Sequence, residues 1–318
     1  MSPSGSGTRL TAYSPDGIGE ITADTDLAAL VLEHLEPVDG DIVVVTSKAV
    51  SKAEGRVVVG DREAAITAES VRVVARKGPT RIVRTRHGLT MAAAGVDASN
   101  VESGSVVLLP EDPDTSARTL RTAIHDRVGR NVGVLVTDTA GRAWREGQTD
   151  MAIGAAGLLV LEEYAGRHDA YGNELAVTAP AVADELAGLA ELTSGKLGGR
   201  PLTLISGRPD LVLPPGEHGS GAAALIRPEA SDLFGLGARE AVLAALGSEP
   251  TSEAFGAAAG HQETLEALTR VAGTTPAVVD DTLVVALPIG VAAALAHALG
   301  WSCEPLAGGE VRFLPRTP

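Results

Sequence analysis

The chain has 318 residues, of which 44% are hydrophobic and only 3% aromatic, so its core must consist mainly of Val, Leu, Ile and Ala. It carries 26 Lys and Arg against 41 Asp and Glu, and the net charge of −15 argues against binding to nucleic acid or anionic membranes. No apolar run reaches the roughly 18 residues of a membrane span, the N-terminus lacks a signal-peptide pattern, and the single cysteine, Cys303, excludes an internal disulfide framework. We therefore expect a soluble cytoplasmic protein.

In chain order, apolar runs alternate with helical patterns, which predicts a mixed α+β fold. An amphipathic helix begins near Asp26 and is followed by a buried strand in residues 41–50. Further strands are expected at SVVLLP, NVGVLVTD, LAVTAP and PLTLISG, with a helix from Thr115 to Arg127 and a longer helix that ends at Gly195. The segment 210–228 is rich in Gly and Pro and predicts a loop with a short helical turn near its end.

From residue 238 onward the pattern predicts two helices, a strand at DTLVVALP, a helix at GVAAALAHALG and a final strand at EVRFL. The length of the chain suggests about two domains. We predict a disordered leader over residues 1–10, a main domain over 11–237 and a small appended α+β domain over 238–318, with SEPTSEAFG as a linker-like stretch.

The segment GLAELTSGKL looks like a phosphate-binding loop but fails the requirements of one. Six residues instead of four separate Gly188 from Gly195, and Leu197 stands where a Ser or Thr would bind magnesium. Lys196 also ends a helix rather than beginning one. The pattern in EHGSGAAA is likewise a weak dinucleotide fingerprint, and a flexible loop is the better interpretation.

Two segments carry side chains suited to phosphate or to a metal. In VVVTSKAVSKAEGR a strand leads to Ser47, followed by Lys48 and Lys52, and these groups can hold phosphate oxygens; a solvated basic helix face is the equally weighted alternative. In AAAGVDASN, Asp97 and Asn100 can supply oxygen ligands to magnesium or manganese. An Asx turn or a helix cap is the favoured alternative for that pair.

A third segment, VTDTAGRAWREGQTD, places much charge after a plain apolar strand. Asp138 and Thr139, at the end of that strand, can hold a cation, and Arg142 and Arg145 can receive carboxylate or phosphate groups. An ordinary polar loop is the alternative for the segment, and pairing with neighbouring carboxylates is the alternative for the arginines. The tryptophan between the arginines is expected to pack, with stacking on a substrate ring as the lesser alternative.

Six motifs occur along the chain in one order: GIGEI, VVVTSKAVSKAEGR, AAAGVDASN, TDTAGRAWREGQTDMAIGAAG, DAYGNEL and VADELAGLAELTSGK. In this order and rough spacing, residues 10–235 resemble the coenzyme F420:L-glutamate ligase family. They also resemble the N-terminal half of the two-domain actinobacterial form. Residues 238–318 are too few for the flavin-binding nitroreductase domain of that form, so no flavin is expected.

The resemblance implies a mixed-sheet γ-glutamyl ligase fold that forms an intertwined homodimer. It implies GTP- and metal-dependent addition of L-glutamate to coenzyme F420-0, with γ-linked extension of the tail, through an acyl phosphate and with release of GDP and phosphate. Two Mg²⁺ or Mn²⁺ ions would serve this reaction, and K⁺ is an open candidate for a further cation. For residues 238–318, an interaction or dimer-stabilising module is preferred over a reductase remnant or a binder of the substrate tail.

Carried over residue by residue, the resemblance implies metal binding by Asp97, Asp138 and Thr139. The implied GTP contacts are Ile18, Gly19, Glu20, Ile21, Ser47, Lys52, Asn100, Ser206, Gly207, Arg208 and Pro209. At the last four of these the sequence ISGRPDLVLPPG departs from the family's arginine and glycine after the strand. Asp97, Asp138 and Arg145 are the predicted catalytic residues, and Arg142 and Arg145 are the predicted substrate contacts.

Two other functions are open. One is a non-catalytic homologue that binds GTP or the deazaflavin, and the other is a phosphoryl-transfer ligase that acts on another acid. A degenerate binder would be expected to have lost a metal ligand, yet Asp97, Asp138 and Thr139 are all present. Their presence favours an active ligase.

Overall fold

The computed structural model describes residues 9–229, 232, 234–247 and 255–316. The predicted leader up to residue 8 and the linker-like residues 248–254 therefore lie outside the described residues. Packing divides the chain into two units. The larger consists of residues up to 73 together with 80–226, and the smaller consists of 74–79 together with 227–318.

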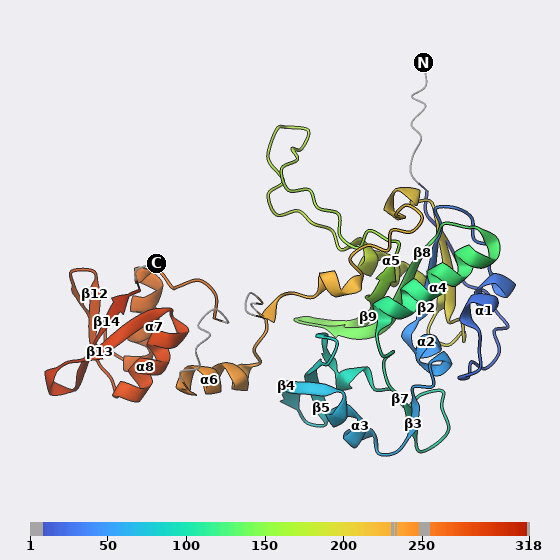
Figure 1. Cartoon of the computed structure of the whole chain (residues 1–318). Helices are drawn as coiled ribbons and strands as arrows, with labels where there is room; N and C mark the ends of the chain where they lie inside the picture. The colour runs from blue at the N-terminus through green and yellow to red at the C-terminus, as the bar shows by residue number, and fades with distance from the viewer. Residues whose placement is uncertain (1–8, 230–231, 233, 248–254, 317–318) are drawn as a thin grey trace. The chain divides into compact units, whose positions relative to one another are not determined.

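The larger unit is built around a five-stranded mixed sheet in the order β1-β10-β2-β8-β9 (Figure 1). Its strands are β1 (Thr11–Tyr13), β2 (Ile42–Thr46), β8 (Gly133–Arg142), β9 (Arg145–Ala156) and β10 (Leu202–Ser206). β2 and β8 run parallel, with Thr46 opposite Thr137, while all other neighbours are antiparallel. The predicted α+β class is therefore confirmed.

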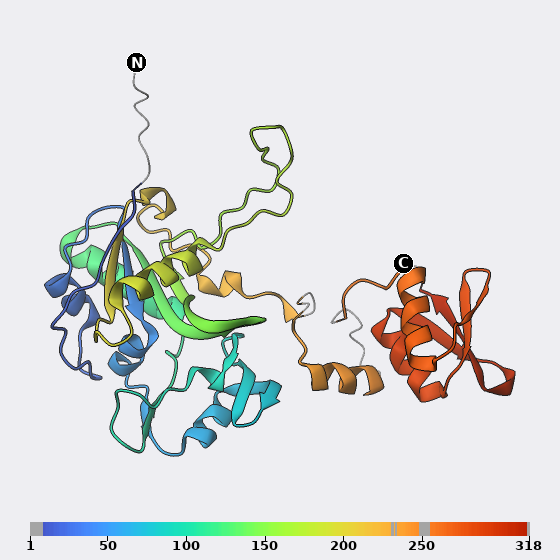
Figure 2. The ribbon, with the colours of Figure 1, turned by 180° about the vertical axis from the view of Figure 1, so that it is seen from behind.

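Helices cover both faces of this sheet. The helices are α1 (Leu27–His34), α2 (Ser47–Ala53) and α4 (Pro113–Val128) on one face, and α5 (Val182–Ser194) on the other (Figures 1 and 2). Because side chains alternate along a strand, Val43 and Val45 share a core with α1 and α4, whereas Ile42 and Val44 share a core with α5. Burial on both faces explains why β2 is a continuous apolar run.

The observed element boundaries refine those expected from the pattern. α1 begins after Asp26, whose carboxylate accepts hydrogen bonds from two N–H groups of the first turn, as expected for a helix cap. β2 ends at Thr46, well before residue 50, because Ser47 already begins α2. The strand predicted at NVGVLVTD continues to Arg142, while residues 175–180, predicted as a strand, form none.

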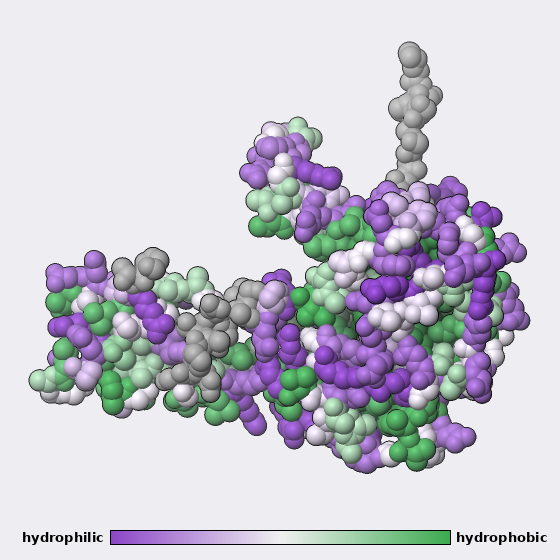
Figure 3. Space-filling view, in the orientation of Figure 1, coloured by the Kyte–Doolittle hydropathy of each residue, from purple (hydrophilic) through white to green (hydrophobic). Residues whose placement is uncertain are grey.

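Short elements lie between β2 and β8 in the sequence. They are β3 (Val57–Val59), α3 (Arg62–Ala68), β4 (Ser70–Lys77), β5 (Thr80–Thr85), β6 (Thr90–Ala92) and β7 (Ser105–Val107). β3 pairs with β7, and β4, β5 and β6 form a three-stranded sheet. Val59 on β3 is 89% exposed, and Figure 3 shows apolar side chains at this edge of the larger unit.

β9 is an edge strand, and acidic side chains from α5 bond to its backbone N–H groups. The Asp184 carboxylate accepts a hydrogen bond from the N–H of Ala152 at 2.8 Å, and Glu191 accepts one from the N–H of Asp150 at 3.0 Å. Asp184 lies in the first turn of α5, and its carboxylate bonds to the sheet. Burial between helix and strand raises the pKa of Asp184.

The smaller unit contains a four-stranded antiparallel sheet in the order β11-β12-β14-β13. Its elements are α6 (Ala238–Gly247), α7 (His261–Ala272), β11 (Ala277–Val279), β12 (Thr282–Ala286), α8 (Ile289–Ala298), β13 (Trp301–Pro305) and β14 (Glu310–Pro315). Leu268, Leu283 and Phe313 are fully buried in its core. The three helices, β12 and β14 match the expected pattern, whereas β11 and β13 were missed because both are short and largely exposed. Within the described ranges, no helix is both long and apolar enough for a membrane span.

Candidate functional site

Parallel pairing of β2 and β8 brings Ser47 and Asp138 together. β2 ends at Thr46, and on β8 Asp138 directly follows Thr137, the partner of Thr46. The Ser47 hydroxyl donates a hydrogen bond to Asp138 Oδ1 at 2.8 Å. Asp138 and Thr139 were expected at the end of a strand, but pairing with β9 continues β8 beyond them, so both residues lie inside it.

A small cavity lies beside this pair. It is lined by Ser47, Lys48, Ser51, Gly95, Asp97, Val107, Leu108, Leu109 and Asp138. The backbone of Asp97 exchanges two hydrogen bonds with Val107, at 2.7 and 3.0 Å, and this pairing holds the segment against the end of β7. Two of the three predicted metal ligands, Asp97 and Asp138, therefore line the same cavity.

The surroundings of the Asp138 carboxyl disfavour its charged form. Although the residue as a whole is half-buried, its carboxyl is enclosed by protein, and this burial raises its pKa to about 6. The nearby charges of Asp150 and Asp97 also raise this pKa, whereas the hydrogen bond from Ser47 lowers it. A bound cation would relieve this accumulation of negative charge.

Asp97 lies in a tight turn and is neutralised by a lysine. Burial acts to raise the pKa of Asp97, but hydrogen bonds from Lys48 and Ser99 outweigh it and the pKa lies below its usual value. The Ser99 N–H and hydroxyl donate to the two Asp97 carboxylate oxygens, both at 2.8 Å. This is the Asx turn that was the favoured alternative for the segment. Asn100, next in the chain, is exposed and has a positive φ of 55°.

A second layer of polar groups lies behind Asp138. Asp150 accepts hydrogen bonds from the hydroxyls of Thr137 at 3.2 Å and Thr139 at 2.6 Å. The Thr139 hydroxyl in turn accepts one from Lys196 Nζ at 2.7 Å, and Lys196 also lies 3.4 Å from Glu191. Burial is the main cause that raises the pKa of Asp150. Asp150 is one of the neighbouring carboxylates that were expected only as alternative partners of the arginines, and its place opposite Thr139 depends on the hairpin register.

Lys52 and the GIGEI segment are joined by an ion pair. The Lys52 side chain is only 10% exposed, and its Nζ lies 2.5 Å from Glu20 Oε1. The interpretation of the lysines as a solvated basic helix face is therefore wrong for Lys52. Ile21 is buried and Ile18 packs against the same core, so the segment Ile18–Ile21 is fixed beside α2.

The predicted nucleotide loop from Ser206 to Pro209 lies at the other end of the sheet. β10 runs antiparallel to β2 with Ile205 opposite Ile42, so the loop follows the strand end farthest from Ser47. A five-residue strand such as β2 spans about 15 Å. Arg208 is occupied there by Glu162 at 3.0 Å and by Asp210 at 2.8 Å. Within one chain, the structure does not bring this loop to the cavity.

Arg142, Trp144 and Arg145 form the tip of the β8–β9 hairpin. Arg142 pairs with Arg145 across the turn, and Trp144 within it has a positive φ of 58°. Both arginines are exposed, and Arg142 donates to the backbone oxygen of Glu146 at 2.9 Å. Arg142 lies four positions after Asp138 along the strand, a distance of about 13 Å. Trp144 is 83% exposed, so the expectation that it packs is wrong within this chain.

The groups around the cavity suit a hard divalent cation. Asp97, Asp138 and Ser47 offer carboxylate and hydroxyl oxygens, which magnesium and manganese prefer. Thr139, the third predicted metal ligand, does not line the cavity, because its hydroxyl faces Asp150 and Lys196. In the part of the chain that the structure describes, no three His, Cys, Asp or Glu side chains converge as in a closed metal cage. An ion held by one or two carboxylates that leaves positions for phosphate oxygens needs no such cage.

Comparison with known proteins gives one consistent family. A family model described as F420-0:Gamma-glutamyl ligase matches residues 17–207. The coenzyme F420:L-glutamate ligase of Archaeoglobus fulgidus is 38% identical over 219 residues, which are 63% of this chain and 88% of the relative.

Two further relatives carry the same name. The protein of Methanopyrus kandleri is 38% identical over 231 residues, 66% of this chain and 91% of the relative. That of Methanothermobacter thermautotrophicus is 36% identical over 246 residues, 69% of this chain and 96% of the relative. With a matching family model and relatives covered over nearly their whole length, this chain belongs to the F420-0:gamma-glutamyl ligase family.

Proposed function

We propose that this chain ligates L-glutamate to coenzyme F420-0 and extends the tail through γ-linkages, with GTP and Mg²⁺ or Mn²⁺ as cosubstrate and cofactors. Relatives named coenzyme F420:L-glutamate ligase, at 36–38% identity, support the class of reaction. The observation that carries the use of a metal and a nucleotide is the shared cavity. There Asp97, Asp138 and the adjacent Ser47 and Lys48 meet from three separate segments of the sequence.

In the proposed reaction, an acceptor carboxylate attacks the γ-phosphorus of GTP, which forms an acyl phosphate and releases GDP. The amine of L-glutamate then attacks the acyl carbon, forms the amide and releases phosphate and a proton. Divalent ions, when bound, would neutralise the charge of the phosphate oxygens. Asp97, Asp138 and Thr139 would hold these ions, and the Ser47 hydroxyl can turn from Asp138 to donate to a phosphate oxygen.

Other residues of the chain would position the substrates. The ion pair between Lys52 and Glu20 holds the backbone of Ile18–Ile21 beside α2, where it can face a nucleotide together with Asn100. The loop Ser206–Pro209 would meet the same nucleotide if the nucleotide extends along β2, or if the loop comes from a second copy in the proposed homodimer. The exposed Arg142 and Arg145 would receive the acidic tail of the deazaflavin.

The test is incubation of the purified protein with the glutamate-free deazaflavin, GTP, manganese and L-glutamate, followed by mass spectrometry. We expect products heavier by one or more glutamate residues, with GDP formed in equal amount. GTP consumption only with a different acid would indicate the other phosphoryl-transfer ligase. Binding of the deazaflavin without mass increase and with GTP intact would indicate the non-catalytic homologue.

A further inference from the structure

Two lysines contact residues that we assign to the metal ions. Lys48 Nζ lies 2.6 Å from Asp97 Oδ2, and it donates to the hydroxyl of Ser99 at 2.7 Å and to its carbonyl at 3.3 Å. Lys196 Nζ lies 2.7 Å from Thr139 Oγ1 and 3.4 Å from Glu191 Oε1. Each ammonium is thus set among oxygens of the kind that a hard cation takes.

The local charge explains why these long side chains are held. An exposed lysine usually keeps its rotamer freedom, because a surface ion pair gains little. The Lys48 side chain is 27% exposed and that of Lys196 is 64% exposed. Both contact or neighbour the acidic cluster of Asp97, Asp138 and Asp150, where the charges of Asp97 and Asp150 raise the pKa of Asp138 and that of Glu191 raises the pKa of Asp150. The cluster therefore attracts whatever cation is within reach.

We propose that Lys48 and Lys196 compete with divalent cations for these oxygens, so that each ammonium must leave when an ion binds to Asp97 or to Thr139. This inference rests on the proposed metal-dependent function. A divalent ion and an ammonium at the same oxygen would repel each other at contact distance. The lysines therefore weaken the binding of free metal ions.

A nucleotide changes this competition. A triphosphate that arrives with its metal brings anionic oxygens, and the displaced ammonium groups can pair with those oxygens instead of with Asp97 and Thr139. The same lysines then oppose a bare ion and favour a metal–nucleotide complex. The metal affinity must therefore be measured both with the nucleotide and without it.

The experiment is a titration of Mn²⁺ into the full chain, with free Mn²⁺ measured by electron paramagnetic resonance. Lys48→Met is expected to tighten Mn²⁺ binding about tenfold in the absence of nucleotide, and Lys196→Met about threefold because it is more exposed. With a non-hydrolysable GTP analogue, both gains should vanish or reverse. Lys77→Met, on β4 in the smaller unit, is the matched control and should leave the affinity unchanged.

Thermal unfolding with and without Mn²⁺ provides a second readout in case a variant is less stable. The Mn²⁺-induced rise in Tm should be larger for Lys48→Met than for the unaltered chain. Mn²⁺ affinity that is unchanged or weaker in both lysine variants overturns the inference. If binding is nevertheless lost in Asp97→Asn, only the inference fails. If the unaltered chain binds no Mn²⁺ even with the analogue, the proposed function fails as well.

Discussion

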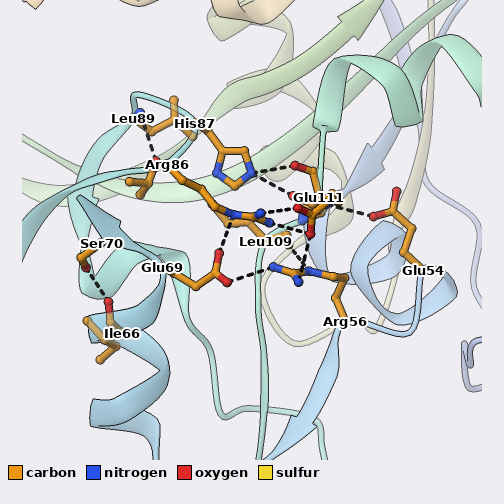
Figure 4. A network of polar contacts seen from close by, with 12 residues as sticks. Glu54, Arg56, Ile66, Glu69, Ser70, Arg86, His87, Leu89, Leu109 and Glu111 are labelled. Atoms are coloured by element: carbon orange, nitrogen blue, oxygen red, sulfur yellow. Dashed lines mark hydrogen bonds and ion pairs between the residues drawn. The ribbon is translucent and has the colours of Figure 1, made fainter.

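The larger unit contains two polar clusters that differ in their charge. In one, acidic and basic side chains compensate each other, and in the other, acidic side chains are in excess. In the cluster of Figure 4, here called the arginine–glutamate cluster, Arg56 and Arg86 alternate with Glu69 and Glu111. Arg56 lies 3.1 Å from each glutamate, and Arg86 lies 2.9 Å from Glu69 and also pairs with Glu111. The hydrogen bond from Arg86 lowers the pKa of Glu111 to about 2. Every charge in this cluster is compensated by its neighbours.

In the acidic cluster, Asp138 and Asp150 lie close together and burial raises the pKa of both. Their side chains accept hydrogen bonds from the hydroxyls of Ser47, Thr137 and Thr139, and Asp138 also accepts one from the N–H of Thr139. The charge of Lys196 lowers the pKa of Asp150 but does not outweigh burial. A fold gains nothing by keeping such carboxylates ionised without compensation. Compensated charges therefore indicate a structural role, whereas excess negative charge at a cavity indicates a site that binds a cation.

Of the substitutions considered, Asp138→Asn should reduce the ligation activity most. We expect glutamate ligation to fall by about a thousandfold or more, because the variant loses a charge that would hold the metal. Mass spectrometry of the deazaflavin product measures this loss. Asp126→Asn, an exposed acid on α4, is the control and should retain full activity. Retention of a tenth of the activity in Asp138→Asn would remove Asp138 from the site.

The same substitution should stabilise the fold at neutral pH. The folded-state pKa of Asp138 is raised to about 6, so its ionisation disfavours the folded state, and this cost grows as pH rises from about 4 through 6. Asp138→Asn should therefore raise the free energy of unfolding by about 2 kcal/mol at pH 8 and by little at pH 4. Denaturant unfolding at both pH values measures the difference. Destabilisation at pH 8 would contradict the electrostatic account.

Asp97→Asn should have the second largest effect, with the opposite sign on stability. We expect about a hundredfold loss of ligation and weaker Mn²⁺ binding. Because the folded-state pKa of Asp97 is lowered, its contribution to stability is present above the unfolded value and is lost as pH falls through the folded value. The variant should thus be less stable than the unaltered chain at pH 7 and similar at low pH. Equal stability shifts in Asp97→Asn and Asp138→Asn would erase the distinction between the two acids.

Arg145→Ala tests a charge outside both clusters. Its guanidinium lies at the exposed hairpin tip, so we expect the Michaelis constant for the deazaflavin to rise about fivefold and turnover to change little. Steady-state kinetics with the glutamate-free deazaflavin measure both constants. If neither changes, Arg145 does not contact the substrate. Arg118→Ala, on α4, serves as a control for the loss of one positive charge.

Glu69→Gln should leave ligation unchanged and act on stability alone. The Glu69 side chain is only 12% exposed and accepts hydrogen bonds from both Arg56 and Arg86. We expect a loss of about 1–3 kcal/mol in the free energy of unfolding, since two arginines lose a shared charge. Glu63→Gln is the matched control, because that side chain is 62% exposed and should contribute little. A large loss of turnover in Glu69→Gln would contradict a purely structural role.

The arginine–glutamate cluster also predicts a response to acid. The pKa of Glu111 is lowered, so the stability it contributes is present above its unfolded value near 4.5 and is lost as pH falls towards about 2. Unfolding midpoints measured from pH 5 to pH 2 should therefore converge for the unaltered chain and for Glu111→Gln. A difference between the two that persists at pH 2 would show that Glu111 acts through packing rather than charge.

Much of the fold and of the site was predictable from local features of the sequence. Asp26 marks the start of α1, and the apolar run of β2 predicts a strand buried on both faces, because caps and side-chain alternation involve neighbouring residues. Asp97 and Asp138 were named as metal ligands because their motifs resemble those of a family. The order of motifs along residues 10–235 predicted the family, and the family model that matches residues 17–207 confirms it.

Only the tertiary structure established which of these residues meet. Apolar runs do not reveal whether strands pair parallel or antiparallel, yet the parallel pairing of β2 with β8 places Ser47 against Asp138. Antiparallel pairing of β10 with β2 places residues 206–209 at the end of the strands farthest from Ser47. The hairpin register sets Asp150 opposite Thr139. Such contacts depend on backbone hydrogen bonds between distant segments, which local propensity does not encode.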